Sequence, residues 1–483
     1  MLPVGKGQNM TRLEEFFEYI NGKRVALLGL GVSNTPLIDF LLSHKAKIIA
    51  HDKKERGGFD NEFISSLEEK GVSFKLGEGY LDSVDADIII KAPGIRKDLP
   101  ALVKAVENGA ILTSEMELFF KLSPCEKLAI TGSDGKTTST TLVHLMLTEH
   151  YKGTDTRVYV GGNIGKPLFS LSGEMKKEDI AVLELSSFQL HAMKASPTGA
   201  IITNVAPNHL DWHTDYAEYI ESKKRVFNFM DSGTVVLNFK NDVTREMASD
   251  LPCGCRVRYF TSGDASAIPD LYTCVYNDNG SIYVWDSEKG ERVHVMDVCD
   301  ILLPGVHNVE NYMGAIALLY GRVDISVFKK IAQSFGGVAH RIELVSEKDG
   351  VKYYNSSIDS SPSRTMAALN AFGDKKVIAI MGGYDKHIPY DVMGDCVCKH
   401  TRAVVLTGAT AEKIREAITG CESAKSELPE IYMEDDFESA VKLAHSLAKS
   451  GDVVILTPAS ASFDKFKNFE ERGERFKEIV KGI

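Results

Sequence analysis

A glycine-containing turn after a short apolar run is the feature that most constrains the fold of this 483-residue chain. Residues 128–131 are typical of a β-strand, residues 132–135 of a loop, and the residues from Lys136 of a helix start. Glycines let backbone N–H groups point at an anion, and a helix N-terminus adds its positive dipole end. The sequence therefore predicts a phosphate-binding strand, loop and helix within an α/β sheet.

The residues of this turn favour a nucleotide as the source of the phosphates. Lys136 can bridge β and γ phosphates, and the Thr137 hydroxyl can ligate magnesium. The longer G-x-x-x-x-G-K-[ST] pattern would have a glycine where Ile130 stands. A plain glycine turn before a helix is the alternative. The expected nucleotide-binding residues here are Gly132, Ser133, Asp134, Gly135, Lys136, Thr137 and Thr138.

Alternating strand-like and helical stretches indicate an α/β chain of about three domains, at roughly 150 residues per domain. We expect a Rossmann-like domain at 1–121, a central P-loop ATPase-like domain with a parallel sheet at 122–337, and a Rossmann-like domain at 338–483. Strand-like runs on both sides of Asn279 and Gly280 predict a hairpin in the central domain. Besides the strand at 128–131, the other expected strands are 24–28, 47–51, 86–91, 180–185, 200–204, 376–381, 403–406 and 453–457.

Composition excludes several classes of protein. A net charge of -11 argues against a wide nucleic-acid surface, which needs clustered Lys and Arg. Residues 1–10 have no apolar core of signal-peptide length, and no stretch approaches the ~18 apolar residues of a membrane span. We therefore expect a cytoplasmic protein without membrane insertion. The eight cysteines lack zinc-site spacing and are expected to be reduced structural thiols.

A second glycine turn lies near the N-terminus. Gly29, Gly31 and Asn34, followed by Asp52, approximate a dinucleotide-binding fingerprint in which the third glycine is absent. An NAD-linked enzyme is one reading of this pattern, but it leaves the turn before Lys136 unexplained.

The turn before Lys136 resembles the shorter T-G-x-x-G-K-[ST]-T form of the Mur ligases. Residues 184–190, E-L-S-S-F-Q-L, and residues 456–473, from L-T-P-A-S-A-S-F to E-E-R-G, are similar to the signatures of members that add D-glutamate. The resemblance extends from Gly29 to the C-terminus. It implies an ATP-dependent ligase that joins D-glutamate to UDP-N-acetylmuramoyl-L-alanine through an acyl phosphate, in peptidoglycan precursor synthesis, and that acts as a monomer.

The resemblance also implies a metal centre with two magnesium ions. Its ligands would be Thr137, Glu184, His209 and a carbamate on Lys223, and the catalytic residues would be Lys136, His209 and Lys223. From the sequence alone, Lys223 is a surface helix residue. Glu184 ends an expected strand, where it can point at a metal or, as the alternative, be a solvated rim residue. The adjacent Lys224 leaves the register of the carbamate open by one position.

Substrate contacts follow from the same resemblance. Asn308, Asn311 and Arg341 would lie on the nucleotide. The N-terminal domain would bind UDP through an anion site at its glycine turn. The expected UDP-side contacts are Ser33, Asp52, Lys54 and Asn163, and the expected D-glutamate contacts are Lys386, Ser462 and Phe469.

Two positions depart from the family pattern. Asp134 stands where Asn is usual, and Ser356 stands where Asp follows Asn355. We expect these changes to be tolerated with reduced ATP affinity, because the helix dipole, Lys136 and metal carry most of the phosphate charge and one hydrogen bond contributes only ~1 kcal/mol net. A ligase for another amino acid, including the folyl-polyglutamate type, and a non-catalytic nucleotide sensor remain open alternatives.

Overall fold

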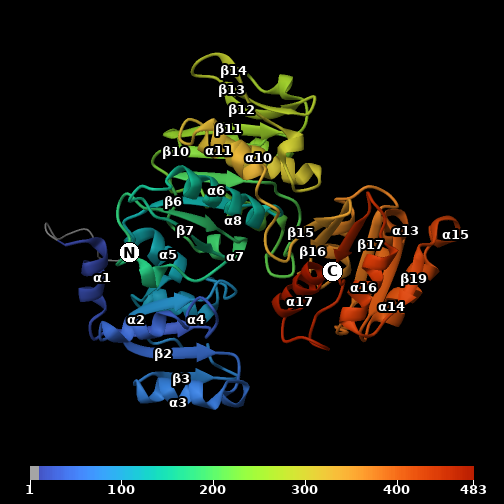
Figure 1. Ribbon diagram of the computed structural model, residues 1–483. Coiled ribbons are helices and arrows are strands. Elements are labelled where there is room, and N and C mark those ends of the chain that lie inside the picture. Colours follow the sequence, from blue (N-terminus) through green and yellow to red (C-terminus); the bar gives the residue numbers. More distant parts are fainter. Residues whose placement is uncertain (1–9) are drawn as a thin grey trace. The chain divides into compact units, whose positions relative to one another are not determined.

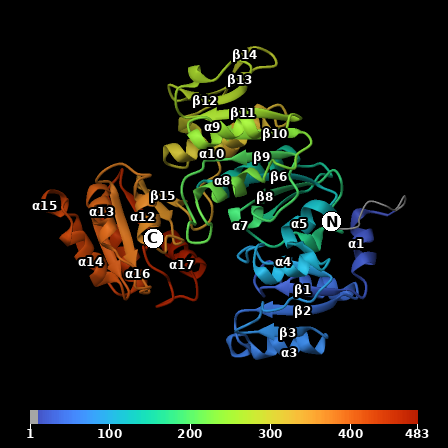
Figure 2. The ribbon, with the colours of Figure 1, turned by 180° about the vertical axis from the view of Figure 1, so that it is seen from behind.

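The computed structural model describes residues 10–483 and shows an α/β chain with three sheets (Figures 1 and 2). The absence of a signal sequence was expected from residues 1–10, and residues 1–9 lie outside the described part. The chain divides into two compact units, Met1–Met296 with Glu310–Phe328, and Asp297–Val309 with Lys329–Ile483. Within residues 10–483, no helix combines the length and apolar character that a bilayer crossing requires.

The first sheet has five parallel strands in the order β3-β2-β1-β4-β5. The strand order reverses between β1 and β4. In sheets of this kind, ligands bind at the carboxyl ends of the two strands that flank the reversal. The strands are β1 (Arg24–Leu28), β2 (Lys47–Asp52), β3 (Ser73–Leu76), β4 (Ile88–Lys91) and β5 (Ile111–Thr113). The helices are α1 (Arg12–Ile20), α2 (Leu37–Ser43), α3 (Asn61–Glu69), α4 (Pro100–Glu107) and α5 (Glu115–Leu122).

The second sheet has nine strands in the order β14-β13-β12-β11-β10-β9-β6-β8-β7. Its strands from β7 to β12 run parallel. The strands are β6 (Glu126–Thr131), β7 (Val158–Gly162), β8 (Ile180–Glu184), β9 (Gly199–Ile202), β10 (Gly233–Asn238), β11 (Cys255–Thr261), β12 (Thr273–Asp278), β13 (Ser281–Asp286) and β14 (Glu291–Asp297). The helices are α6 (Lys136–His150), α7 (Ser187–Leu190), α8 (Tyr216–Lys224), α9 (Asp242–Glu246), α10 (Val306–Leu319) and α11 (Ile325–Ala332).

The third sheet, in the second unit, has six strands in the order β15-β16-β20-β17-β18-β19. Apolar side chains are buried in two clusters, one containing Ile414 of α14 and the other Phe476 of α17. The strands are β15 (Glu343–Lys348), β16 (Val351–Asn355), β17 (Val377–Gly382), β18 (Thr401–Thr407), β19 (Glu430–Met433) and β20 (Val453–Leu456). The helices are α12 (Pro362–Leu369), α13 (Gly394–His400), α14 (Ala411–Gly420), α15 (Ala424–Glu427), α16 (Phe437–Leu447) and α17 (Phe469–Gly482).

The expected α/β fold with three domains is confirmed, and the boundaries at 121 and 337 stay predictions. The hairpin is confirmed too, because β12 and β13 pair antiparallel across Asn279 and Gly280. These residues have φ values of 52° and 87°. Positive φ at both positions is typical of the type I′ turn, whose twist matches that of the strands.

Replacing Gly280 with Ala should lower the free energy of unfolding by about 1 kcal/mol, because an L side chain is strained at this φ. Gly420→Ala at the end of α14 is the matched control. No described atom lies within 4 Å of an added Cβ at either glycine, but only Gly280 has positive φ. Urea unfolding followed by circular dichroism compares the two variants. A Gly280→Ala midpoint equal to that of the unmodified chain would contradict the left-handed turn.

Candidate active site

The turn between β6 and α6 admits no side chain at its two glycines. Gly132 has φ of 147°, and an added Cβ there would lie 1.9 Å from Thr203 Oγ1. Gly135 has φ of 75°, and its added Cβ would lie 2.3 Å from Asn311 Oδ1. Gly135 is also the N-cap of α6 and makes no side-chain cap. The predicted strand, loop and helix are therefore confirmed, with the helix N-terminus at the turn.

The segment that follows β9 holds this turn in place. Asn204 Oδ1 accepts hydrogen bonds from the backbone N–H groups of Ser133 and Asp134, at 3.1 and 2.8 Å. Ser133 Oγ lies 2.9 Å from both Ala206 O and Tyr219 Oη. Asn204 was not among the expected site residues, and its only sequence signal is its place at the end of the expected strand 200–204.

Lys136 lies over the turn that precedes it. Its ammonium donates to Gly132 O at 3.1 Å and to Ser133 O at 2.8 Å. A cation held at this point neighbours the helix N-terminus, so both features favour the same anion.

Glu184 ends β8 beside the turn and is 2% exposed. Its Oε1 accepts a hydrogen bond from Asn163 Nδ2 at 2.8 Å. Its Oε2 is buried and has no hydrogen-bond partner within the described residues. A buried carboxylate oxygen without a donor is costly, and a hard divalent cation would satisfy it. The alternative reading of Glu184 as a solvated strand end is therefore wrong.

Glu184 could supply only part of a magnesium shell. Among residues 10–483, no group of three or more His, Cys, Asp or Glu side chains is arranged to hold a metal ion. Magnesium commonly takes one or two protein carboxylates, and its remaining ligands are waters and substrate phosphates. The donors near this turn are compatible with that pattern.

Lys223 of α8 is 1% exposed, so the expectation of a surface helix residue is wrong. Its Nζ donates to Gly132 O at 2.7 Å and to Thr131 Oγ1 at 3.2 Å. Burial, and then the nearby Lys136, lower the pKa of Lys223 well below its usual range. Lys224 instead pairs with Glu221 and Asp250 at 2.7 and 2.8 Å. Of the two lysines, Lys223 is therefore the one that faces the turn.

His209 lies in the loop after β9 with a left-handed φ of 55°, which is uncommon for a non-glycine residue. Its carbonyl accepts hydrogen bonds from Trp212 N and His213 N at 3.1 and 3.0 Å. Its ring centroid lies 4.8 Å from that of Phe188. Burial and then Lys136 lower the pKa of His209, which favours the neutral imidazole that binds metals.

Two of the expected nucleotide-side residues, Asn308 and Asn311, lie on the same helix, α10. Asn311 on α10 accepts a hydrogen bond from Ser139 Oγ at 3.1 Å, beside Gly135. Asn308 is buried in the second unit and donates to Pro304 O at 2.6 Å. Arg341, also in the second unit, is half-buried.

Three of the four expected UDP-side residues lie at the glycine turn of the first sheet. Asp52 ends β2, and its carboxylate accepts the backbone N–H groups of Leu30 and Lys54 at 2.7 and 2.9 Å. Ser33 is half-buried in the turn after β1. Asn163 lies apart from them, at the end of β7.

Asn34 explains why the third glycine of the dinucleotide pattern is absent. Its side chain is fully buried, and its Nδ2 donates to Leu28 O at 2.9 Å and to Gly29 O at 3.1 Å. The side chain at this position therefore stabilises the turn after β1.

In the second unit, Arg472 organises the loop that contains Ser462. Arg472 is 3% exposed and donates to Ser357 O, Ser460 O and Ala461 O at 2.9, 3.1 and 3.1 Å. Ser462 is buried next to these carbonyls. Arg472 was not among the expected site residues, although it lies within residues 456–473, which resemble the family signature.

The other two expected D-glutamate contacts differ in exposure. Phe469 is half-buried, and its ring centroid lies 5.9 Å from that of His340. Lys386 is exposed in the loop after β17.

Asp359 places a carboxylate beside the departure at Ser356. The Asp359 side chain is buried, hydrogen-bonds with Ser356, and accepts from Thr457 Oγ1 at 3.0 Å. Burial raises the pKa of Asp359 to about 7. An acidic side chain three residues further along the chain therefore contacts position 356.

Two domain families and several relatives match this chain. Residues 130–319 match the Mur ligase middle domain, and residues 340–460 match the Mur ligase glutamate ligase domain. A UDP-N-acetylmuramoylalanine–D-glutamate ligase of Acetivibrio thermocellus is 48% identical over 98% of this chain and 99% of its own length. One of the same name from Clostridium novyi is 45% identical over 97% and 99%.

Solved structures share the fold at low identity. MurF from Acinetobacter baumannii has a TM-score of 0.53 and 13% identity, covering 96% of this chain and 92% of that one. A pseudomurein peptide ligase type C from Methanothermus fervidus has a TM-score of 0.50 and 16% identity, covering 95% and 100%. Together with the full-length relatives, the two domain matches show that the chain belongs to the Mur ligase family.

Proposed function

We propose that the chain is an ATP-dependent ligase that joins D-glutamate to UDP-N-acetylmuramoyl-L-alanine in peptidoglycan precursor synthesis. The observation that carries the proposal is the turn before Lys136, which brings a cation, a helix N-terminus and buried Glu184 to one place. Relatives of nearly equal length, at 45–48% identity, have this activity in their names. We further propose that the protein acts as a monomer in the cytoplasm.

The reaction needs a phosphorylated acid, because an amine does not displace oxide from a carboxylate. The L-alanyl carboxylate oxygen attacks the γ phosphorus of ATP, the bond to the ADP oxygen breaks, and an acyl phosphate forms. The amine of D-glutamate then attacks the acyl carbon, phosphate leaves, and the amine loses a proton. Lys136 and the N–H groups at the start of α6 stabilise the negative charge on the transferred phosphoryl group.

Magnesium ions, when bound, would supply charge neutralisation at the phosphates. Thr137, Glu184 and His209 would hold them, with Asn163 orienting Glu184 through its hydrogen bond. A carbamate on Lys223 would be a further oxygen ligand in a two-ion site. Its formation is chemically reasonable, because a lysine with a depressed pKa retains the neutral amine that adds CO2 and releases a proton.

The remaining contacts are assigned by position. Gly132, Ser133, Asp134, Gly135 and Thr138 contribute the nucleotide turn. On this assignment, Asn308, Asn311 and Arg341 bind the nucleotide; Ser33, Asp52, Lys54 and Asn163 lie on the UDP side; and Lys386, Ser462 and Phe469 receive D-glutamate. The proposed domains are 1–121 for UDP, 122–337 for ATP and 338–483 for the amino acid.

The first prediction concerns the amino acid. With ATP, magnesium and UDP-N-acetylmuramoyl-L-alanine, phosphate release and a new amide product should depend on D-glutamate, and L-glutamate, L-lysine and glycine should give little. Phosphate release together with mass spectrometry of the product measures this. A chain that turns over with another amino acid and not with D-glutamate would contradict the proposal.

The second prediction concerns Lys223. Native mass spectrometry in bicarbonate buffer should show a mass increase of one CO2, which Lys223→Met should abolish together with most ligase activity. Lys224→Met is the matched control, since its side chain pairs with surface carboxylates away from the turn. The control should keep both the added mass and the activity. An added mass that survives Lys223→Met would show that the modified group lies elsewhere.

A further inference from the structure

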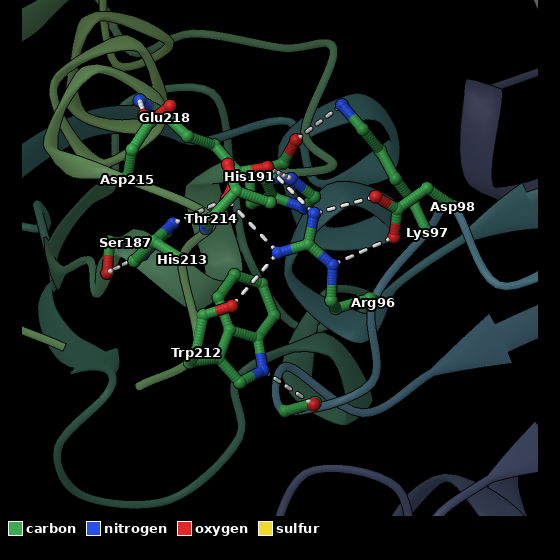
Figure 3. Close-up of polar contacts among 11 residues, drawn as sticks. Arg96, Lys97, Asp98, Ser187, His191, Trp212, His213, Thr214, Asp215 and Glu218 are labelled. Atoms are coloured by element: carbon green, nitrogen blue, oxygen red, sulfur yellow. Dashed lines mark hydrogen bonds and ion pairs between the residues drawn. The ribbon is translucent and has the colours of Figure 1, made fainter. Parts of the chain in front are cut away.

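Arg96, in the loop after β4, uses all the N–H donors of its guanidinium (Figure 3). Two of its N–H groups, on Nε and Nη2, donate to the Asp98 carboxylate at 2.9 and 2.6 Å. Two others, on Nη2 and Nη1, donate to the Glu218 carboxylate at 2.8 and 3.0 Å. The last, on Nη1, donates to Trp212 O at 3.0 Å. A guanidinium has five N–H donors and an ammonium three, so lysine cannot reproduce this set. Trp212 and Glu218 follow β9 of the second sheet, so Arg96 connects two sheets of the first unit.

Glu218 is the acceptor on which this network converges. Besides Arg96, its carboxylate accepts Thr214 N at 2.9 Å and lies 3.3 Å from His191 Nε2 and 3.4 Å from His213 Nδ1. Hydrogen bonding to Arg96 lowers the pKa of Glu218 below its usual range, so the carboxylate is ionised. Glu218 lies in the first turn of α8, where its own N–H donates to the N-cap Asp215 at 2.7 Å.

Further hydrogen bonds join the loop after β4 to two segments of the second-sheet region, one after α7 and one after β9. Trp212 Nε1 donates to Gly94 O at 3.0 Å, and Lys97 Nζ donates to His191 O at 2.9 Å. The Arg96 guanidinium also lies 5.0 Å from the centre of the Trp212 ring, a cation–π distance. Residues 94–98 are thus attached to the second sheet by backbone and side-chain contacts together.

The network lies between two parts of the proposed site. On one side, the loop after β4 packs on the glycine turn of the first sheet: Ala92 N donates to Leu28 O at 2.8 Å, and Ala92 Cβ would lie 2.9 Å from a Cβ added at Gly29. On the other side, the backbone N–H of Trp212 donates to the carbonyl of His209. Helix α8 carries Lys223 five residues after Glu218.

We propose that Arg96 and Glu218 are positioning residues, which hold the His209 loop and the start of α8 against the turn that takes the UDP part of the acceptor. The inference rests on the proposed function, and neither side chain touches the reacting groups. The left-handed conformation of His209 persists only if surrounding contacts fix it. The backbone N–H groups of the turn before Lys136 are held by Asn204, and α8 reaches this turn through Tyr219 and Lys223 and not through Glu218. Arg96→Lys should therefore affect ATP binding less than binding of the acceptor.

The test compares Arg96→Lys with Arg322→Lys. Arg322 also donates to both oxygens of one carboxylate, Glu126, at 2.9 and 2.8 Å. The two ion pairs are similarly exposed, with side-chain exposures of 29% and 31% for Arg322 and Glu126 and of 20% and 22% for Arg96 and Glu218. They differ in that the Arg322–Glu126 pair lies wholly within the second-sheet region and does not connect two sheets. Both variants keep the positive charge and lose the guanidinium group that donates to both carboxylate oxygens.

Arg96→Lys should lower kcat/KM for UDP-N-acetylmuramoyl-L-alanine on the order of tenfold to hundredfold, because small displacements of positioned groups are costly. Its KM for ATP, and both parameters of Arg322→Lys, should stay within about threefold of the unmodified chain. Glu218→Gln should reproduce the Arg96→Lys loss, and the double variant should lose little more, since residues acting as one unit are not additive. Equal effects of Arg96→Lys and Arg322→Lys would overturn the inference.

Trp212 provides a readout independent of catalysis, because the chain has two tryptophans, Trp212 and Trp285. In a Trp285→Phe background, Arg96→Lys should shift the Trp212 emission to longer wavelength and increase acrylamide quenching, whereas Arg322→Lys should do neither. An emission unaffected by Arg96→Lys would overturn the inference even if the unmodified chain proves to be a ligase. If no amino acid is ligated by the unmodified chain, the proposed function fails, and the Trp212 comparison still decides whether Arg96 fixes this loop.

Discussion

The exclusion of side chains at Gly132 and Gly135 is the constraint on which the proposed site depends. Thr203 and Asn311 fill the space that a Cβ would need, and both glycines have positive φ. The same close packing brings the backbone of the turn against the segment after β9 and sets the start of α6 at Lys136. Two effects therefore determine the conformation of the turn: its packing against neighbouring segments, and the ability of glycine to adopt positive φ.

Two ionisable side chains beside this turn, Lys223 and Glu184, are buried away from water, which is energetically costly. Lys223 is buried against Gly132 O, and its pKa is depressed by burial and by Lys136. Glu184 leaves one carboxylate oxygen without a hydrogen-bond donor. A buried carboxylate oxygen without a donor is costly in an isolated protein and becomes favourable when a cation binds it. This is the physical reason to propose magnesium beside Glu184.

The sequence was sufficient for the features that depend on neighbouring residues. It predicted the strand, loop and helix around Lys136 and the hairpin at Asn279 and Gly280, because glycine position and apolar runs determine them locally. It did not predict short strands such as β3 and β5, nor the burial of Glu184 and Lys223, which depends on packing between distant segments. The Arg96–Glu218 pair spans 122 positions, and no local pattern indicates it.

The central claim is that the turn before Lys136 holds the terminal phosphates of ATP so that a carboxylate becomes an acyl phosphate. Steady-state amide formation by Lys136→Ala tests it most directly, with circular dichroism to establish that the variant is folded. The account predicts a loss of kcat of at least about a hundredfold, the scale seen when one charge-stabilising donor is removed from an active site. Amide formation at the unmodified rate would contradict it.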